Sequence, residues 1–267
     1  MSALVFRLRE PPPERLDLSP LVPQRLAGLS ARDIERLPVG TSRFGLVVGD
    51  LFAVSGDDPT DLRIEGGSDR LDHVGARLAG GRLAVAGDVG QRLGFAMTGG
   101  EIRVEGSAGP FAASGSRGGT VRIAGDAGPS AGGAVYGATG GLDGGTLVVE
   151  GRAGPRLGDR MRSGLIVADA AGDHAGCRMI AGTLVAGTVG DHPGYGMRRG
   201  TILVRAHGAI LPSFVETGSH RLVVLRLLAK TLATAAPGWA GGPGASVRRL
   251  SGDLATLGKG EILVTDG

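Results

Sequence analysis

Short apolar runs recur along the middle of the chain, and in each run one other residue separates two apolar residues. The pairs are Leu83/Val85, Ile102/Val104, Val121/Ile123, Leu147/Val149 and Leu165/Val167. Because successive side chains of a β-strand point to opposite faces, each pair is predicted to lie on one face of a strand. A glycine opens each run, and the opening glycines are Gly81, Gly100, Gly119, Gly145, Gly164, Gly182 and Gly200. Their intervals of 19, 19, 26, 19, 18 and 18 residues indicate a repeated unit, one copy of which carries about seven extra residues.

Three further columns of residues keep the same spacing. A second glycine column is Gly87, Gly106, Gly125, Gly151 and Gly187, with Asp169 in the equivalent place, and a third is Gly90, Gly109, Gly128, Gly154, Gly172 and Gly190. Glycine at a fixed turn position suits a positive φ or close contact between coils. The last column, seven residues after the third glycine, holds Met97, Met161, Met179 and Met197. Identical apolar residues at one coil position predict a buried core column rather than a metal-binding track.

These columns predict an all-β fold, namely a single-stranded right-handed parallel β-helix with coils of 18 to 19 residues. A left-handed β-helix of three hexapeptides per coil is the alternative. It fits poorly, because steps of six residues from Val167 reach Asp173 and Asp191, where an aliphatic residue is required.

The pattern divides the chain into three regions. Residues 1–40 are predicted as an N-terminal extended segment and short helix, residues 41–210 as the β-helix, and residues 211–267 as a C-terminal helix and terminal strand. Ser30 is expected to cap the N-terminal helix, which ends at Leu37 before a proline. Ahead of Gly81, regular pairing is expected at Leu62/Ile64, and irregular coils are expected at Phe44/Leu46 and Phe52/Val54.

The C-terminal region is predicted to hold a helix from about His220 to Ala235, capped by Thr217 or Ser219. Its apolar stripe should close the open end of the coils or cover their side, and consists of Leu222, Leu225, Leu228 and Leu232. Residues 241–244 resemble a flexible glycine loop, and residues 261–264 a last strand.

Composition narrows the classes of partner. The 51 glycines accompany 42% hydrophobic residues, which is typical of an ordered and turn-rich fold. A net charge of +3 and 3% aromatic residues argue against nucleic-acid and sugar binding. The single cysteine, Cys177, cannot form an internal disulfide, the N-terminus lacks the features of a signal peptide, and the most apolar stretch is too short to span a bilayer. A cytoplasmic protein without membrane contact is expected.

Candidate chemistry is concentrated in two similar turns, 172–176 and 190–194. Asp173 is expected to stack on Asp191 and His174 on His192, one coil apart. With Cys177 these residues resemble part of a zinc site, but third and fourth ligands at consistent spacing are missing. We therefore expect no catalytic, cofactor-binding or metal-binding residue on this chain, and interpret the turns as a hydrogen-bonded ladder that faces a partner.

The insertion at 130–144 consists almost entirely of small residues around Tyr136. A phosphate-binding loop is disfavoured, because the segment has no lysine and does not lead from a strand into a helix. A loop that docks on a neighbouring protein of a complex is the preferred interpretation.

The coils from Gly81 to Arg205 resemble the β-helical domain shared by the C subunits of formylmethanofuran dehydrogenases and the C-terminal domain of the glutamate synthase large subunit. The flanks narrow the choice. The segments 17–21, 26–37, 211–218 and 252–261 are similar to those of the C subunit of the bacterial formyltransferase/hydrolase complex.

This resemblance implies a non-catalytic scaffold subunit of a complex that transfers a formyl group from formyl-tetrahydromethanopterin to a methanofuran-type carrier and releases formate, in formaldehyde oxidation by methylotrophs. The implied partners are the hydrolase, the formyltransferase and a further subunit, with zinc and the carrier on those partners. Alternatives are a glutamate-synthase-like module, a molybdenum or tungsten formylmethanofuran dehydrogenase subunit, and a stand-alone β-helical carbohydrate enzyme.

Overall fold

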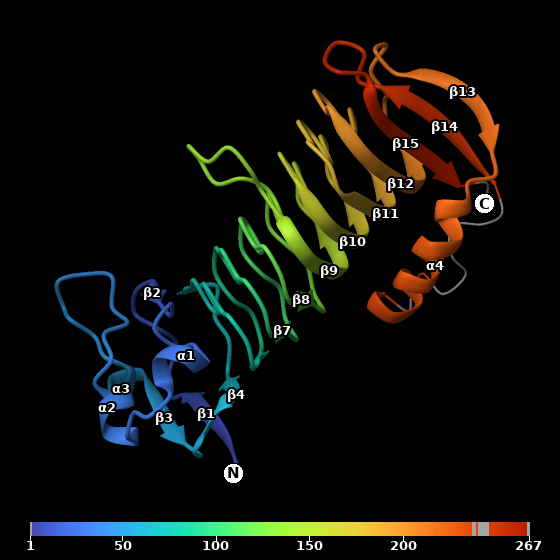
Figure 1. Cartoon of the computed structure of the whole chain (residues 1–267). Coiled ribbons are helices and arrows are strands. Elements are labelled where there is room, and N and C mark those ends of the chain that lie inside the picture. The colour runs from blue at the N-terminus through green and yellow to red at the C-terminus, as the bar shows by residue number, and fades with distance from the viewer. Residues whose placement is uncertain (1, 237–238, 240–245, 266–267) are drawn as a thin grey trace.

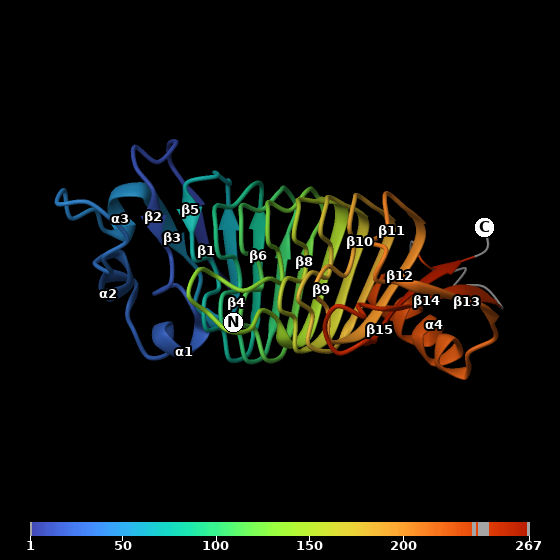
Figure 2. The same cartoon turned by 90° about the horizontal axis from the view of Figure 1, so that it is seen from above.

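The computed structural model describes residues 2–236, 239 and 246–265, and most of its regular structure is strand. The strands form a 13-stranded sheet in the order β13-β14-β15-β12-β11-β10-β9-β8-β7-β6-β4-β1-β3, and a separate two-stranded sheet pairs β2 with β5. The chain is elongated, and the coils follow one another along its length (Figures 1 and 2). The all-β prediction is confirmed.

Eight central strands pair in parallel, each with the strand of the next coil. They are β4 (Asp58–Glu65), β6 (Arg82–Ala86), β7 (Glu101–Val104), β8 (Thr120–Ile123), β9 (Asp143–Ala153), β10 (Ser163–Ala171), β11 (Thr183–Val189) and β12 (Arg199–His207). Leu83 lies opposite Ile102 and Ile102 opposite Val121, as the repeat spacing predicts. Leu62 and Ile64 lie opposite Leu83 and Val85, so the pairing predicted ahead of Gly81 is also confirmed.

The opening glycines all have a positive φ, from 79° at Gly145 to 104° at Gly200. They also lie directly against the preceding coil, since a Cβ atom on Gly145 would be 2.5 Å from the carbonyl oxygen of Gly119. In the third column the φ values are not positive and close contact is the reason for glycine. A Cβ atom on Gly109, for example, would be 2.8 Å from the carbonyl carbon of Gly90.

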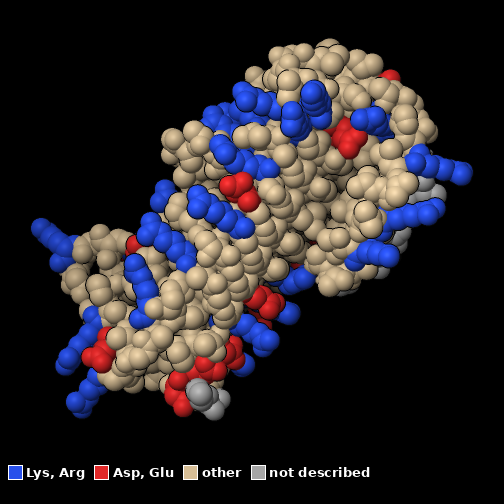
Figure 3. Space-filling model, in the orientation of Figure 1, with Lys and Arg blue, Asp and Glu red and all other residues tan. Residues whose placement is uncertain are grey.

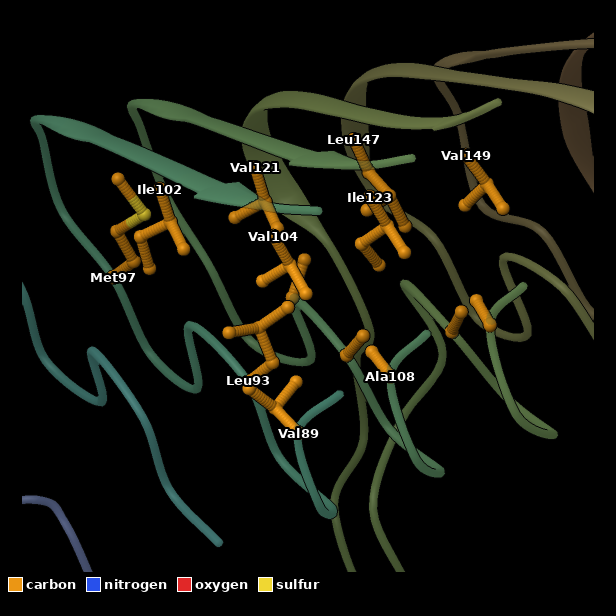
Figure 4. Packing of buried hydrophobic residues seen from close by; sticks show 14 of the residues in the cluster. Val89, Leu93, Met97, Ile102, Val104, Ala108, Val121, Ile123, Leu147 and Val149 are labelled. Atoms are coloured by element: carbon orange, nitrogen blue, oxygen red, sulfur yellow. The ribbon is translucent and has the colours of Figure 1, made fainter. Parts of the chain in front are cut away.

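The four methionines of the predicted column are completely buried. The backbone N–H of Ile180 donates to the carbonyl of Met161 at 2.8 Å, and that of Arg198 donates to the carbonyl of Met179 at 2.8 Å. These methionines therefore hold the same position in consecutive coils. Figure 4 shows Met97 in the core beside the stacked aliphatic side chains of β7, β8 and β9.

One predicted pair, Leu165/Val167, is on the wrong face. In the observed register Leu147 lies opposite Ile166, so that Ile166 and Ala168 face the interior. Leu165 and Val167 instead belong to a second hydrophobic cluster on the outside of the sheet. Both faces of β10 are covered, so the side chains on both faces are apolar. The alternation of apolar residues therefore does not show which face points to the interior.

Helix α4 (Val223–Ala235) covers the outer face of the sheet in its C-terminal half (Figure 1). Its buried residues Leu225 and Leu232 contact a set of apolar outer-face side chains, which are Val148, Leu165, Val167, Val185, Leu203 and Leu263. Over β4, β6 and β7 the same face carries charged residues, which include Asp61, Arg63, Arg82, Glu101 and Arg103. The change from charged to apolar residues along the sheet therefore determines where the helix packs. Of the two predicted roles for its stripe, covering the side is the one observed.

Replacing Leu232 by aspartate should detach α4 from the sheet. Leu232 is fully buried, and burial of a leucine side chain is worth about 1.5 to 3 kcal/mol. Limited proteolysis of the L232D variant should cut the 221–236 segment much faster than in the wild type. The matched control is L227D, because Leu227 lies on the same helix and is 62% exposed. Equal cleavage rates in the two variants would contradict the observed packing.

The N-terminal region contains more strand than the sequence predicts. β1 (Ala3–Leu8) pairs in parallel with β4 and antiparallel with β3 (Phe52–Ser55). The irregular coils expected at Phe44/Leu46 and Phe52/Val54 are therefore wrong: Phe44 is 78% exposed, and Phe52 and Val54 belong to the antiparallel strand. The remaining elements are β2 (Leu16–Asp17), α1 (Pro23–Leu26), α2 (Ala31–Glu35), α3 (Val48–Leu51) and β5 (Leu71–Asp72).

Helix α2 has the predicted cap. The Ser30 hydroxyl oxygen accepts from the N–H of Asp33 at 3.3 Å, and the Asp33 carboxylate accepts from the N–H of Ser30 at 3.2 Å. The Ser30 hydroxyl also donates to the Asp33 carboxylate at 2.6 Å, and this bond, followed by the one from the Ser30 N–H, lowers the pKa of Asp33. The helix ends at Glu35, two residues before the predicted end.

The C-terminal segment ends the sheet with β13 (Val215–His220), β14 (Val247–Gly252) and β15 (Lys259–Thr265). β15 pairs in parallel with β12, which confirms the strand predicted at 261–264. The predicted cap of α4 is wrong, because Thr217 and Ser219 lie in β13 and the helix begins after Leu222 without a side-chain cap. The glycine loop expected at 241–244 lies outside the described residues.

Among the helices described, none combines the length and hydrophobicity needed to cross a membrane.

Candidate functional site

The turns at 172–176 and 190–194 lie one above the other, as the repeat predicts. The N–H of Asp191 donates to the Asp173 carboxylate at 2.9 Å, and the N–H of Ala209 donates to the Asp191 carboxylate at 2.8 Å. The rings of His174 and His192 have centroids 5.6 Å apart and planes inclined by 49°. Each aspartate thus satisfies a backbone N–H of the next coil.

The same contact recurs outside these two turns. The carboxylate of Asp88 accepts from the N–H of Ser107 at 2.7 Å, and that of Asp126 accepts from the N–H of Arg152 at 2.7 Å. Acceptance by a turn carboxylate is therefore a structural device of the coils, while the two stacked imidazoles are specific to this pair of turns.

The candidate zinc ligands are not brought together. In the described part of the chain, no group of three or more His, Cys, Asp and Glu side chains could hold a metal ion. Cys177 is buried, and this burial raises the pKa of its thiol to about 12, with the nearby Asp159 carboxylate acting in the same direction and Arg178 opposing it. The thiol is therefore protonated at physiological pH and is a poor metal ligand or nucleophile.

Cys177 should resist alkylation in the folded chain. Because the thiolate is the reactive form and the folded-state pKa lies well above the usual value, its reaction with iodoacetamide at pH 8.5 should be at least about a hundredfold slower than in the chain unfolded in guanidinium chloride. Mass spectrometry of samples quenched over time measures both rates. Comparable rates would show that the thiol is exposed or activated.

The insertion containing Tyr136 forms a loop that projects from one flank of the coils (Figure 1). Tyr136 is 82% exposed, although its ring packs against that of Phe111 in a T-shaped arrangement with 5.5 Å between centroids. At the base of the loop, Arg160 donates to the carbonyl oxygen of Ala138 at 2.8 Å. An exposed tyrosine is therefore held on a loop that is attached to the coils.

Beside this loop the surface forms a hollow of 750 Å³ that sequence reasoning missed. We call it the arginine hollow; its charged lining residues are Arg160, Arg162, Arg178, Arg198 and Asp253. Figure 3 shows a row of basic side chains, with few acidic ones among them, along the flank from which the loop projects. The signal was present in the sequence, because these arginines lie one residue before or after the methionine column.

The only carboxylate in the lining of the arginine hollow, within the residues described, is turned toward the backbone. Burial of Asp253 opposes ionisation, but its carboxylate accepts hydrogen bonds from Ser213 and from the N–H groups of Ala255 and Gly196, so the pKa is lowered. The Asp253 carboxylate remains ionised at neutral pH, and its oxygens are already hydrogen-bonded to these donors.

Comparison with known proteins finds relatives that match nearly the whole chain. No protein-family model matches it. The curated C subunit of the formyltransferase/hydrolase complex Fhc of Methylorubrum extorquens is 57% identical over 260 residues, which are 97% of this chain and 98% of the relative. The X-ray crystal structure of the formyltransferase/hydrolase complex FhcABCD of the same organism, in complex with methylofuran, contains a similar chain. That chain is 55% identical, the TM-score is 0.94, and the match covers 98% of this chain and all of the other.

The chain belongs to the family of formyltransferase/hydrolase complex C subunits. The flank segments that suggested this family lie within a match that covers nearly the entire length, so the resemblance predicted from the sequence is confirmed. The glutamate-synthase-like and formylmethanofuran dehydrogenase alternatives are not favoured.

Proposed function

We propose that this chain is a non-catalytic scaffold subunit of a complex that transfers formyl from formyl-tetrahydromethanopterin to a methanofuran-type carrier and releases formate. The observation that supports this most strongly is the 57% identity to a C subunit of such a complex across 97% of the chain, flanks included. The solved relative is part of an FhcABCD complex with methylofuran, which supports a hydrolase, a formyltransferase and a further subunit as partners.

The non-catalytic part of the proposal is supported by what the polar side chains do. The turn carboxylates Asp173 and Asp191 accept backbone hydrogen bonds, and Cys177 is a buried, protonated thiol. In this proposal zinc and the carrier belong to the partner subunits, and the complex works in the cytoplasm.

We also propose that the stacked coils are a right-handed parallel β-helix that acts as a rigid support. Residues 1–40 and 211–267 would form its two terminal regions, and residues 41–210 would contain the coils, which begin at β4. The parallel pairing of successive strands at intervals of 18 or 19 residues supports this architecture. The turns with Asp173, His174, Asp191 and His192, and the loop with Tyr136, would then be contact surfaces for partners.

Co-expression of the tagged full chain with its three candidate partners tests the scaffold function. The purified chain alone should neither transfer nor hydrolyse formyl groups, and the tag should retain hydrolase, formyltransferase and the third partner in fixed ratio. Omission of this chain should separate the other subunits on gel filtration. Formyl hydrolysis by the chain alone, or an intact complex without it, would disprove the proposal.

A further inference from the structure

Most of the positive charge in the arginine hollow is not paired with acidic side chains of the described residues. We propose that this hollow is the docking site for an acidic, extended peptide segment of a partner subunit. This inference rests on the scaffold function proposed above, and deepens it by naming a surface and the chemistry of what it binds.

Backbone hydrogen bonds place the arginines in two columns. The N–H of Arg162 donates to the carbonyl of Leu142, and that of Arg198 donates to Met179, as Arg117 does to Met97. These arginines therefore share the coil position that directly follows the methionine column. In the same way, Arg160 donates to Cys177 and Arg178 to Tyr195, which places these two arginines at equivalent positions one coil apart.

This arrangement stacks like charges at close spacing. Neighbouring coils are separated by the strand spacing of about 4.8 Å, so Arg160 and Arg178 are near neighbours, and Arg162 and Arg198 are roughly 10 Å apart across two coils. Like charges directly opposite each other in neighbouring strands are destabilising. An anionic ligand would remove this repulsion.

Most of these charges are not neutralised internally. Arg178 makes two hydrogen bonds to the buried Asp159, at 2.9 and 2.5 Å, and is therefore held in place. Arg160 donates to a carbonyl oxygen and Arg162 lies 3.5 Å from the Thr139 hydroxyl, and neither forms an ion pair with an acidic side chain of the described residues. Among the described residues, Arg198 has no ion-pair partner.

The shape of the arginine hollow favours an extended ligand over a small anion. It reaches from Thr139 on the projecting loop to Ala255 and Thr256 in the turn before β15. A single phosphate or carboxylate would fill only part of a hollow of 750 Å³, whereas three or four residues of extended chain run the roughly 10 Å between the backbones of Arg162 and Arg198. Guanidinium groups pair well with carboxylates, so Glu or Asp side chains of such a segment match the lining.

Binding of a model peptide tests the site on the isolated full chain. The probe is a fluorescein-labelled decapeptide of alternating Glu and Gly, with a Gln–Gly decapeptide as its neutral counterpart, followed by fluorescence anisotropy at low salt. The double variant R162E/R198E should weaken binding of the acidic peptide by about tenfold or more, and added salt should weaken binding to the wild type.

The matched control is R82E/R103E, which makes the same change in net charge on the exposed outer face of β6 and β7. It should bind the acidic peptide within about twofold of the wild type, because long-range charge effects on an exposed surface are screened. Equal loss of binding in both double variants would show a nonspecific effect of net charge, and would overturn the proposal. Displacement of the peptide by millimolar inorganic phosphate, but not by equal ionic strength of sodium chloride, would identify a small-anion site and also overturn it.

The co-expressed complex separates failure of this inference from failure of the scaffold function. With R162E/R198E, one partner should dissociate at lower salt than with the wild-type chain or R82E/R103E. If the wild-type chain retains all partners and R162E/R198E retains them to the same salt concentration, only the docking site is wrong. If the wild-type chain retains none, the scaffold function itself is wrong.

Discussion

Replacing Gly145 by alanine should lower the free energy of unfolding by about 3 kcal/mol or more. Gly145 has a φ of +79°, which costs an alanine roughly 1 to 2 kcal/mol. The new Cβ atom would also lie 2.5 Å from the carbonyl oxygen of Gly119 and 2.8 Å from the carbonyl carbon of Gly118. Since both are backbone atoms, the neighbouring coil has to move. Urea denaturation followed by circular dichroism measures the change.

Gly115 offers a matched control, because its φ is +67° and a Cβ atom there would meet nothing within 4 Å. G115A should therefore show the conformational cost alone, about 1 to 2 kcal/mol. Equal destabilisation by G115A and G145A would mean that contact between coils is not what requires glycine at the opening position.

Replacing Met179 by alanine should cost about 2 to 5 kcal/mol. The side chain is completely buried, and its terminal methyl carbon lies 2.9 Å from where a Cβ atom of Gly200, at the opening of the next coil, would be. Truncation leaves a cavity between two coils that the stacked backbones cannot close, so the transfer and cavity costs both apply. The denaturation midpoint of M179A, compared with the wild type, measures the loss.

M179L keeps the volume and should cost less than about 1.5 kcal/mol. If M179A were as stable as M179L, the methionine column would not be part of the packed core. The methionine and glycine columns pack against each other, because methionine methyl groups lie over the opening glycines Gly119, Gly182 and Gly200.

The coils could be predicted from the sequence because residues one coil apart lie directly over one another. Glycines in the column of Gly145 and methionines in the column of Met179 therefore recur at regular intervals, which can be read from the sequence alone. The register of β10 could not be predicted in the same way. Ile166 faces the interior and Leu165 faces α4, and both environments select aliphatic residues, so alternation alone does not distinguish them.

The ends of the chain were less predictable, because their pairing is not between neighbouring coils. β1 pairs with β4 across more than fifty residues, and no repeat records that contact. Thr217 and Ser219 have the chemistry of helix caps but lie in a strand, since pairing with β14 outweighs the local preference. The stacked turns with Asp173 and Asp191 could be predicted from the sequence. The arginine hollow could not, because its arginines come together only when successive coils are placed in register.

The outermost strands of the large sheet, β3 and β13, both run antiparallel to their neighbours β1 and β14. At the β3 edge, another copy of the chain placed end to end would therefore meet a strand that runs opposite to the coils. At the other edge β13 runs in the direction of the coils, but the antiparallel strand β14 separates it from them. The same hydrogen-bonding pattern that adds coil to coil within one molecule is thus interrupted at its limits, which disfavours growth into fibres.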